Sequence, residues 1–186
     1  RPQNGSHRDY RGYAGRLSSG IIRKGDNITV LPSGFTSKVK TIDTYNESLD
    51  EAFAPMSISV TLEDDIDISR GDMIVRTNNK PEATQDIDVM LCWLHNNPAR
   101  PRAKYTIKQT SNDQKAMVKE VVYKININTL ERDKEDKDLT MNSFAKVKIR
   151  TTKPLMIDSY KNNKSTGSVI LIDDNTNETV AAGMVV

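Results

Sequence analysis

Apolar and polar residues alternate with a period of two along much of this chain, as they do in half-buried β-strands. The alternation is clearest in four segments, residues 57–62, 104–108, 124–128 and 146–150. No segment longer than about ten residues has the 3.6-residue period of an amphipathic helix. In the segment 146–150 the pattern places three cations on the outer face of the strand. The pattern predicts an all-β protein.

Turn sequences separate the predicted strands at short spacing, for example at residues 24–26 and 96–98. Many short strands joined by tight turns are typical of antiparallel sandwiches and barrels, not of parallel βαβ units. Residues 77–86 are polar, contain a proline and lack alternation, which indicates a linker. We therefore predict two consecutive antiparallel β-barrels, at residues 1–80 and 81–186, each of an ordinary domain size.

Composition narrows the class of protein further. Of the 186 residues 36% are hydrophobic and only 5% are aromatic, so the cores must be mainly aliphatic. The net charge is only +2, so the chain lacks the excess of cations that dominates non-specific nucleic-acid binding. The single cysteine, Cys92, excludes an intrachain disulfide. With no apolar run near the roughly 18 residues of a membrane helix and no secretory signal, we predict a soluble, cytoplasmic protein without a membrane or nucleic-acid partner.

The two ends of the chain predict that it is part of a longer one. It opens at Arg1 with a polar, turn-prone lead-in, and it closes at Val186 within an apolar run that is typical of a strand. We expect a further region to precede Arg1.

Motifs for nucleotide binding are missing from the sequence. The phosphate-binding Gly-x-x-x-x-Gly-Lys-Ser/Thr loop does not occur. Residues 79–82, Asn-Lys-Pro-Glu, resemble the guanine motif Asn-Lys-x-Asp but end in Glu and lie in the predicted linker, so chance explains them. Gly12 and Gly15 are too few glycines for a dinucleotide loop. The sequence predicts no cofactor-binding residue in this chain.

The two histidines and the cysteine give no clear catalytic pair. Cys92 lies in the apolar segment 89–94, where a free cysteine usually behaves as a small hydrophobic residue. In a strand, His95 would point to the opposite face from Cys92. His7 lies in the polar lead-in and is expected to face solvent. We predict no catalytic residue.

Two acidic segments could be mistaken for cation sites. Residues 63–67 lack the alternating spacing and the central glycine of a calcium loop, which favours a solvated turn. Residues 131–138 mix both signs of charge and are expected to form an exposed loop. We predict no metal ligand.

Two kinds of motif match extracellular functions. Residues 70–72 are the adhesion tripeptide Arg-Gly-Asp. N-glycosylation sequons begin at Asn4, Asn27, Asn46, Asn163 and Asn177. The chain is rich in Asn, Ser and Thr, so sequons arise by chance, and neither a signal peptide nor paired cysteines support an adhesion module.

A basic stretch surrounds one aromatic residue. Arg100, Arg102, Lys104 and Lys108 flank Tyr105. Such a stretch could bind RNA through phosphate contacts and base stacking, or it could bind an acidic partner protein. It could equally be a solvated strand face with its leading loop. The residues alone leave these alternatives open.

Residues 15–26, Gly-Arg-Leu-Ser-Ser-Gly-Ile-Ile-Arg-Lys-Gly-Asp, resemble a signature of the second domain of translational GTPases of the elongation factor Tu class. That signature is Gly-Arg-[Val/Ile]-x-x-Gly-x-[Val/Ile]-x-x-Gly-Asp. Further segments resemble the GTPase (large) subunit of bacterial ATP sulfurylase, and they follow the family's order over nearly the whole chain. They are residues 8–15, 30–34, 36–40, 51–54, 61–72, 126–131, 153–155, 158–160, 166–173 and 176–184. Ala181 and Val169 depart from the family's usual Gly and Phe, and a strand tolerates both changes.

The resemblance implies the second and third domains of a sulfate adenylyltransferase subunit, two β-barrels of the elongation factor Tu domain 2 and domain 3 type. In that family the small subunit makes adenosine 5′-phosphosulfate and pyrophosphate from ATP and sulfate, and the large subunit hydrolyses GTP to drive the reaction. GTP and Mg²⁺ would be bound by a G domain before Arg1, so none of the family's site residues falls in this chain. The implied partners are the small catalytic subunit, in a heterodimer, and the chain's own N-terminal G domain.

Three functions are compared on this basis. In the first, two rigid barrels transmit the nucleotide state of the G domain to the catalytic subunit through contacts that differ between the two states. In the second, the chain is a translation-factor fragment that binds tRNA or the ribosome. In the third it is an adhesion module. The near-neutral charge and the match in residues 166–184 favour the first.

Overall fold

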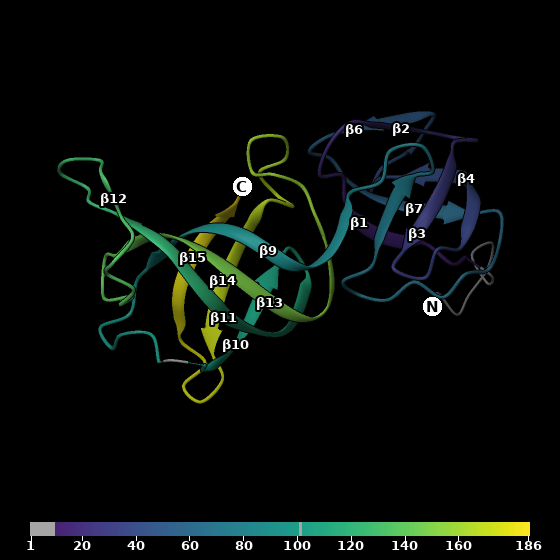
Figure 1. Ribbon diagram of the computed structural model, residues 1–186. Coiled ribbons are helices and arrows are strands. Elements are labelled where there is room, and N and C mark those ends of the chain that lie inside the picture. Colours follow the sequence, from purple (N-terminus) through teal and green to yellow (C-terminus); the bar gives the residue numbers. More distant parts are fainter. Residues whose placement is uncertain (1–9, 101) are drawn as a thin grey trace. The chain divides into compact units, whose positions relative to one another are not determined.

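The computed structural model describes residues 10–100 and 102–186 (Figure 1). These residues form strands, turns and loops and contain no helix, and therefore none with the length and hydropathy of a membrane span. By its internal contacts the chain divides into two compact units, residues 1–80 and 81–186. The all-β class predicted from the alternation is confirmed.

The first unit contains eight short strands within its described residues. They are β1 (Tyr13–Arg16), β2 (Ile21–Arg23), β3 (Asn27–Leu31), β4 (Thr36–Asp43), β5 (Ser48–Leu49), β6 (Glu51–Phe53), β7 (Ser57–Leu62) and β8 (Met73–Arg76). One antiparallel sheet has the order β1-β7-β4-β3-β8, with β5 on β4, and β2 pairs separately with β6. Both sheets bury side chains in the same core.

That core is aliphatic, as the composition requires. Ile22 from β2 and Ala52 from β6 are buried together with Ile28 from β3 and Val60 from β7. The alternation of β7 predicted from the sequence places Ile58, Val60 and Leu62 inside. Complete burial of an Ile or Val side chain contributes about 1.5–3 kcal/mol, so each of these positions stabilises the first unit.

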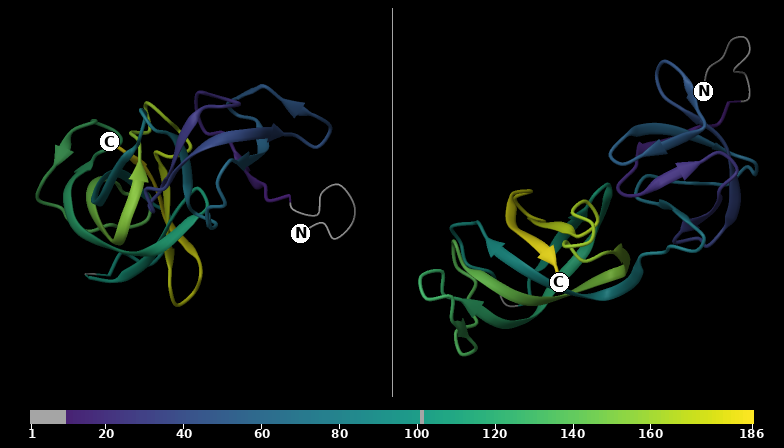
Figure 2. Two further views of the ribbon diagram at one scale, coloured as in Figure 1. Left: turned by 90° about the vertical axis from the view of Figure 1, so that its right-hand side faces the viewer. Right: turned by 90° about the horizontal axis from the view of Figure 1, so that it is seen from above.

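The second unit contains the longer strands. They are β9 (Glu82–Trp93), β10 (Lys104–Gln109), β11 (Asn112–Ile125), β12 (Arg132–Asp133), β13 (Phe144–Ile157), β14 (Ser168–Asp173) and β15 (Thr179–Val185). The sheet order is β10-β14-β15-β9-β13-β11, and β10 also pairs with β11, so six strands close into a barrel (Figure 2). The two-residue strand β12 pairs with the end of β11 outside this ring. Closure leaves no free edge among the six strands.

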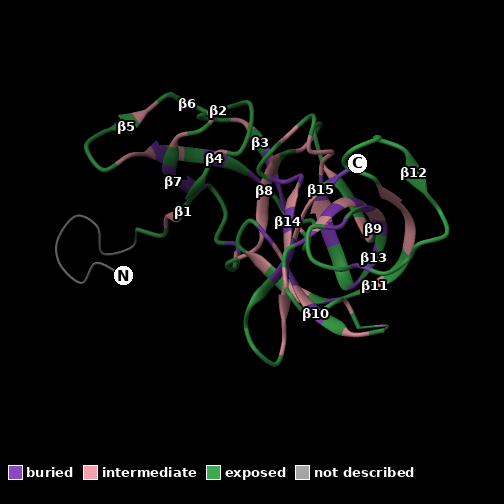
Figure 3. Ribbon diagram, turned by 90° about the vertical axis from the view of Figure 1, so that its left-hand side faces the viewer, coloured by how far each residue is buried: buried purple, intermediate pink, exposed green. Residues whose placement is uncertain are grey.

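Side chains from every strand of the barrel fill its interior. Ile107, Ala145, Leu155 and Leu171 are at most 1% exposed. Trp93 packs edge-to-face on Tyr105 with ring centroids 5.8 Å apart, an arrangement that adds to the stabilisation from burial. Figure 3 shows buried residues on the barrel strands and exposed residues around β12.

The outer face of β13 carries the three cations expected from its alternation. Lys146 Nζ lies 2.9 Å from Asp88 on β9, and Lys148 Nζ lies 3.5 Å from Glu120 on β11. Arg150 pairs with a carboxylate on β9 as well. The cations on β13 therefore bind to the two neighbouring strands.

Two predicted boundaries are wrong. The linker is shorter than residues 77–86, because β9 already begins at Glu82. The strand predicted at residues 124–128 ends at Ile125. Beyond it, Asn126 Oδ1 accepts the backbone N–H groups of Asn128 and Thr129 at 2.9 and 3.3 Å. Asparagine competes for backbone hydrogen bonds in this way, so a turn replaces the strand despite the alternating residues.

Candidate functional site

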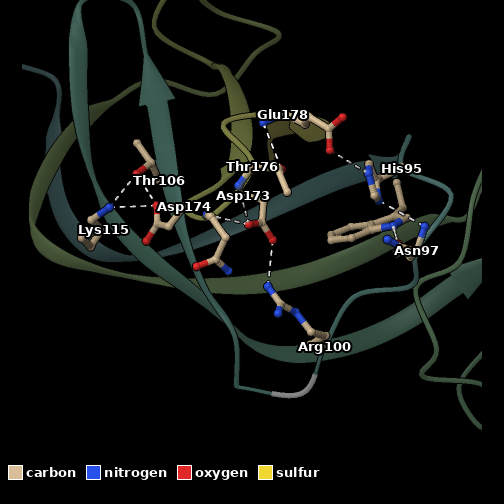
Figure 4. Close-up of polar contacts among 11 residues, drawn as sticks. His95, Asn97, Arg100, Thr106, Lys115, Asp173, Asp174, Thr176 and Glu178 are labelled. Atoms are coloured by element: carbon tan, nitrogen blue, oxygen red, sulfur yellow. Dashed lines mark hydrogen bonds and ion pairs between the residues drawn. The ribbon is translucent and has the colours of Figure 1, made fainter.

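A polar cluster joins the turn between β14 and β15 to the loop after β9 (Figure 4). At its centre, Asp173 Oδ1 accepts the N–H groups of Asn175 at 2.8 Å and Thr176 at 3.4 Å. Its other oxygen accepts a hydrogen bond of 2.8 Å from the guanidinium of Arg100. The backbone N–H of Asn175 and the Arg100 charge hold the pKa of Asp173 below its ordinary value. One carboxylate thus shapes the turn and anchors the loop.

Asp174 makes the second set of contacts. Its Oδ1 accepts a hydrogen bond of 2.7 Å from Thr106 Oγ1 on β10 and lies 2.8 Å from Lys115 Nζ on β11. Lys115 also donates to Thr106 at 3.1 Å. The hydrogen bond from Lys115, followed by that from Thr106, lowers the pKa of Asp174. These contacts tie the β14–β15 turn to the two strands that close the barrel.

His95 belongs to the same cluster and not to a dyad with Cys92. Because β9 ends at Trp93, His95 lies in the loop, and the argument from opposite strand faces does not apply to it. Its Nδ1 accepts the N–H of Asn97 at 3.1 Å, so the neutral ring carries its proton on Nε2, which lies 3.2 Å from Glu178 Oε2. Burial raises the pKa of the Cys92 thiol, which keeps it protonated and a poor nucleophile.

The basic stretch is a strand face with a docked loop. Tyr105 is 2% exposed inside the barrel, and burial raises its pKa, so its ring is not available for stacking on a base. Arg100 is paired with Asp173, and Lys108 Nζ lies 3.7 Å from Asp113. The stretch therefore lacks the exposed aromatic residue, and part of the free positive charge, that RNA binding would require.

The acidic segments are not arranged to bind a metal ion. Asp65 and Asp67 both pair with Arg11, and Asp64 accepts a hydrogen bond of 2.7 Å from Ser37. Residues 131–138 are exposed, as expected. Among residues 10–100 and 102–186, no group of three His, Cys, Asp or Glu side chains could hold a metal ion.

The Arg-Gly-Asp tripeptide forms a local turn. Asp72 Oδ2 accepts the N–H of Ser69 at 2.8 Å, and Gly71 has a φ of 99°, which favours glycine. The aspartate therefore stabilises its own turn. The sequon at Asn4 and the solvent-exposed position expected for His7 lie outside the described residues.

The first unit has an open polar groove of 830 Å³. An ion pair of 2.8 Å between Arg76 and Asp26 lies in its wall, and Ser37 and Asp64 line it as well. Burial opposes ionisation of Asp26, but the hydrogen bonds from the Arg76 side chain and the Arg23 backbone N–H, together with the charges of both arginines, outweigh it and lower the pKa. Arg76 and Asp26 thus pair with each other in the wall of the groove.

Residues 86–186, more than half of the chain, match the family described as GTP-eEF1A C-terminal domain-like. The chain belongs to this family. Its likenesses to curated proteins extend over both units. It is 48% identical over 186 residues to the bifunctional enzyme CysN/CysC of Mycobacterium tuberculosis, covering all of this chain and 30% of that protein. It is 44% identical to sulfate adenylyltransferase subunit 1 of Bacteroides thetaiotaomicron, over 96% of this chain and 38% of that protein.

The resemblance to the sulfate adenylyltransferase GTPase subunit is thereby confirmed. The chain spans less than half the length of these curated relatives. Among solved structures, Sup35 in complex with GDP superimposes with a TM-score of 0.84 at 20% identity, over 95% of this chain and 45% of that one. The elongation factor SelB of Methanococcus maripaludis gives a TM-score of 0.72 at 18% identity, over 92% of this chain and 38% of that one. These likenesses confirm the translation-factor type of the fold.

Proposed function

We propose that this chain is the two-barrel part of the GTP-hydrolysing subunit of a cytoplasmic sulfate adenylyltransferase. In this role it couples GTP hydrolysis in a preceding G domain to formation of adenosine 5′-phosphosulfate by a small catalytic subunit. The observation that carries the proposal is the 44–48% identity to CysN/CysC and to sulfate adenylyltransferase subunit 1, which extends over both units.

The chain itself serves as a scaffold and carries no active site. Asp173 and Asp174, whose pKa values are lowered, are engaged in shaping a turn and closing the barrel. GTP and Mg²⁺ are bound by the G domain, and the barrels transmit its nucleotide state through contacts that differ between the GTP and GDP forms. A closed barrel suits this role because each of its six strands is hydrogen-bonded to both neighbours around the ring.

Titration of GTP and Mg²⁺ into the isolated chain tests the division of labour. We expect no saturable heat, because the phosphate-binding and guanine-binding motifs lie outside the chain. The matched control is the full-length subunit, which should bind GTP under the same conditions. Saturable binding to the isolated chain would contradict the proposal.

The alternative of a translation-factor fragment that binds tRNA rests on the fold and on the basic stretch. Burial of Tyr105 and pairing of Arg100 with Asp173 argue against it. Binding of tRNA at low ionic strength that weakens steeply with added salt would revive it.

A further inference from the structure

Three adjacent strands of the second barrel are apolar on both faces. The order β14-β15-β9 places side by side the stretches 169–172, 180–185 and 89–94, each of which is almost continuously apolar. A strand with one solvated face alternates apolar and polar residues, whereas continuous apolar sequence is typical of strands covered on both faces. The residues that point inward are apolar because they form the barrel core. The apolar residues that point outward have no such explanation.

The strand register brings the outward residues together. Met184 pairs with Met90, and Ala182 pairs with Cys92 on one side and with Ile170 on the other. Phe144 on β13 continues the same row, because it pairs with Cys92. The residues of this outer apolar face are Met90, Cys92, Phe144, Ile170, Ala182 and Met184. Phe144 and Met184 are each 43% exposed, and the other four are partly buried beside them.

The strands that flank this face are different. On β13, Lys146 and Lys148 point outward beyond Phe144, and on β10, Lys104 and Lys108 do so. Ion pairs border the face, with Lys146 and Asp88 2.9 Å apart on one side and Lys115 and Asp174 2.8 Å apart on the other. An apolar centre with a polar rim is the usual anatomy of a protein–protein interface.

The charges also indicate the kind of partner. Four of the bordering cations are paired with carboxylates of this chain, so a polyanion such as RNA gains little there; they are Lys108, Lys115, Lys146 and Lys148. A partner face that complements this surface is apolar and near neutral. We propose that the outer apolar face of the second barrel docks a partner protein of this kind, which under the proposed function is the small catalytic subunit.

The experiment uses the full-length subunit and the small subunit, with binding measured by biolayer interferometry. Phe144→Lys and Met184→Lys place a charge at the two most exposed positions of the face. Phe35→Lys is the matched control, since Phe35 is 61% exposed on the first unit. We expect each of the first two variants to weaken binding by about 30-fold or more, as at central interface positions, and the control to bind like the wild type.

Thermal unfolding of the same variants separates docking from folding. We expect unchanged melting temperatures, because both side chains reach solvent. A fall in the melting temperature of the full-length subunit would show that the face is buried within that subunit, and would overturn the proposal. The proposal would also be overturned if both variants bound the small subunit as tightly as the wild type does. If the variants instead lost self-association but still bound the small subunit, the face would be assigned to a second copy of the chain. If the wild-type full-length subunit does not bind the small subunit at all, the proposed function itself fails.

Discussion

Asp173 and Asp174 show how single carboxylates determine the local structure of the second barrel. Neighbouring in sequence, they act on different partners: one organises its own turn and the Arg100 loop, and the other joins β10 and β11. Neither role follows from the sequence, where residues 173–177 are simply a polar turn. The roles depend on Arg100 and Lys115, which lie 73 and 59 residues away in the chain.

Asp174→Asn tests the electrostatic part of this contact through its pH dependence. The pKa of Asp174 lies below its ordinary value of 3.8 in the folded chain, so the charged form stabilises the fold above pH 3.8 and this stability is lost as the pH falls through the lower folded pKa. Exposed ion pairs contribute about 0.2–1 kcal/mol, so we expect the variant to melt no more than about 5 °C below the wild type at pH 7. This difference should shrink below pH 3.8.

Asp113→Asn is the control, since Asp113 lies 3.7 Å from Lys108 in a looser exposed pair. Melting curves between pH 3 and pH 7 give the comparison. A gap between wild type and Asp174→Asn that stays constant over this range would show that the carboxylate acts only as a hydrogen-bond acceptor.

Gly183 lies at a close approach between β15 and β9. A Cβ atom there would lie 2.4 Å from Val89 Cγ1 and 3.0 Å from Met90 O, closer than side-chain contacts allow. Gly183→Ala should therefore destabilise the second unit by about 1–3 kcal/mol, as overpacking does. Gly15→Ala is the control, because no atom outside Gly15 and its two chain neighbours lies within 4 Å of its Cβ position. Equal urea midpoints for the two variants would contradict the packing argument.

At the scale of elements, alternation predicted strands well where one face is buried and the other solvated. Ser57–Leu62 and the cations of β13 are examples. It failed at Asn126, where an alternating sequence continues but the asparagine side chain caps a turn. The outer apolar face could not be assembled from the sequence, because it requires the register of four strands that are distant in the chain.

Closure of the second barrel depends on β10, which bonds to β11 and β14. Lys108 pairs with Asp113 on one side and Ile170 on the other, so its backbone lies within the sheet. Lys108→Pro should cost about 2–4 kcal/mol, from the lost N–H bond and the distorted ladder. Lys108→Thr keeps the N–H and should stay within about 0.5 kcal/mol of the wild type, as surface changes do. Urea unfolding followed by fluorescence of Trp93, the single tryptophan, measures both.

If the proline variant unfolds at the wild-type midpoint, β10 does not contribute to closure, and the ring of six strands is not a cooperative unit.

At the scale of the whole molecule, fold and chemistry are separable. The same two-unit fold occurs in Sup35 and SelB at 18–20% identity, so the fold does not determine the substrate. The proposed function rests on identity of 40–48% over both units to proteins named CysN/CysC or sulfate adenylyltransferase subunit 1. In the proposed enzyme, the chemistry belongs to neighbouring domains and subunits, and the barrels supply the connection.

The most direct test of that connection is adenosine 5′-phosphosulfate formation by the small subunit together with the full-length subunit, measured with and without GTP. The account predicts that GTP raises the yield of adenosine 5′-phosphosulfate. It also predicts that a subunit lacking residues 10–186 still hydrolyses GTP, but that GTP then no longer raises this yield. Equal yield with and without GTP, or a full GTP effect without the barrels, would contradict the central claim.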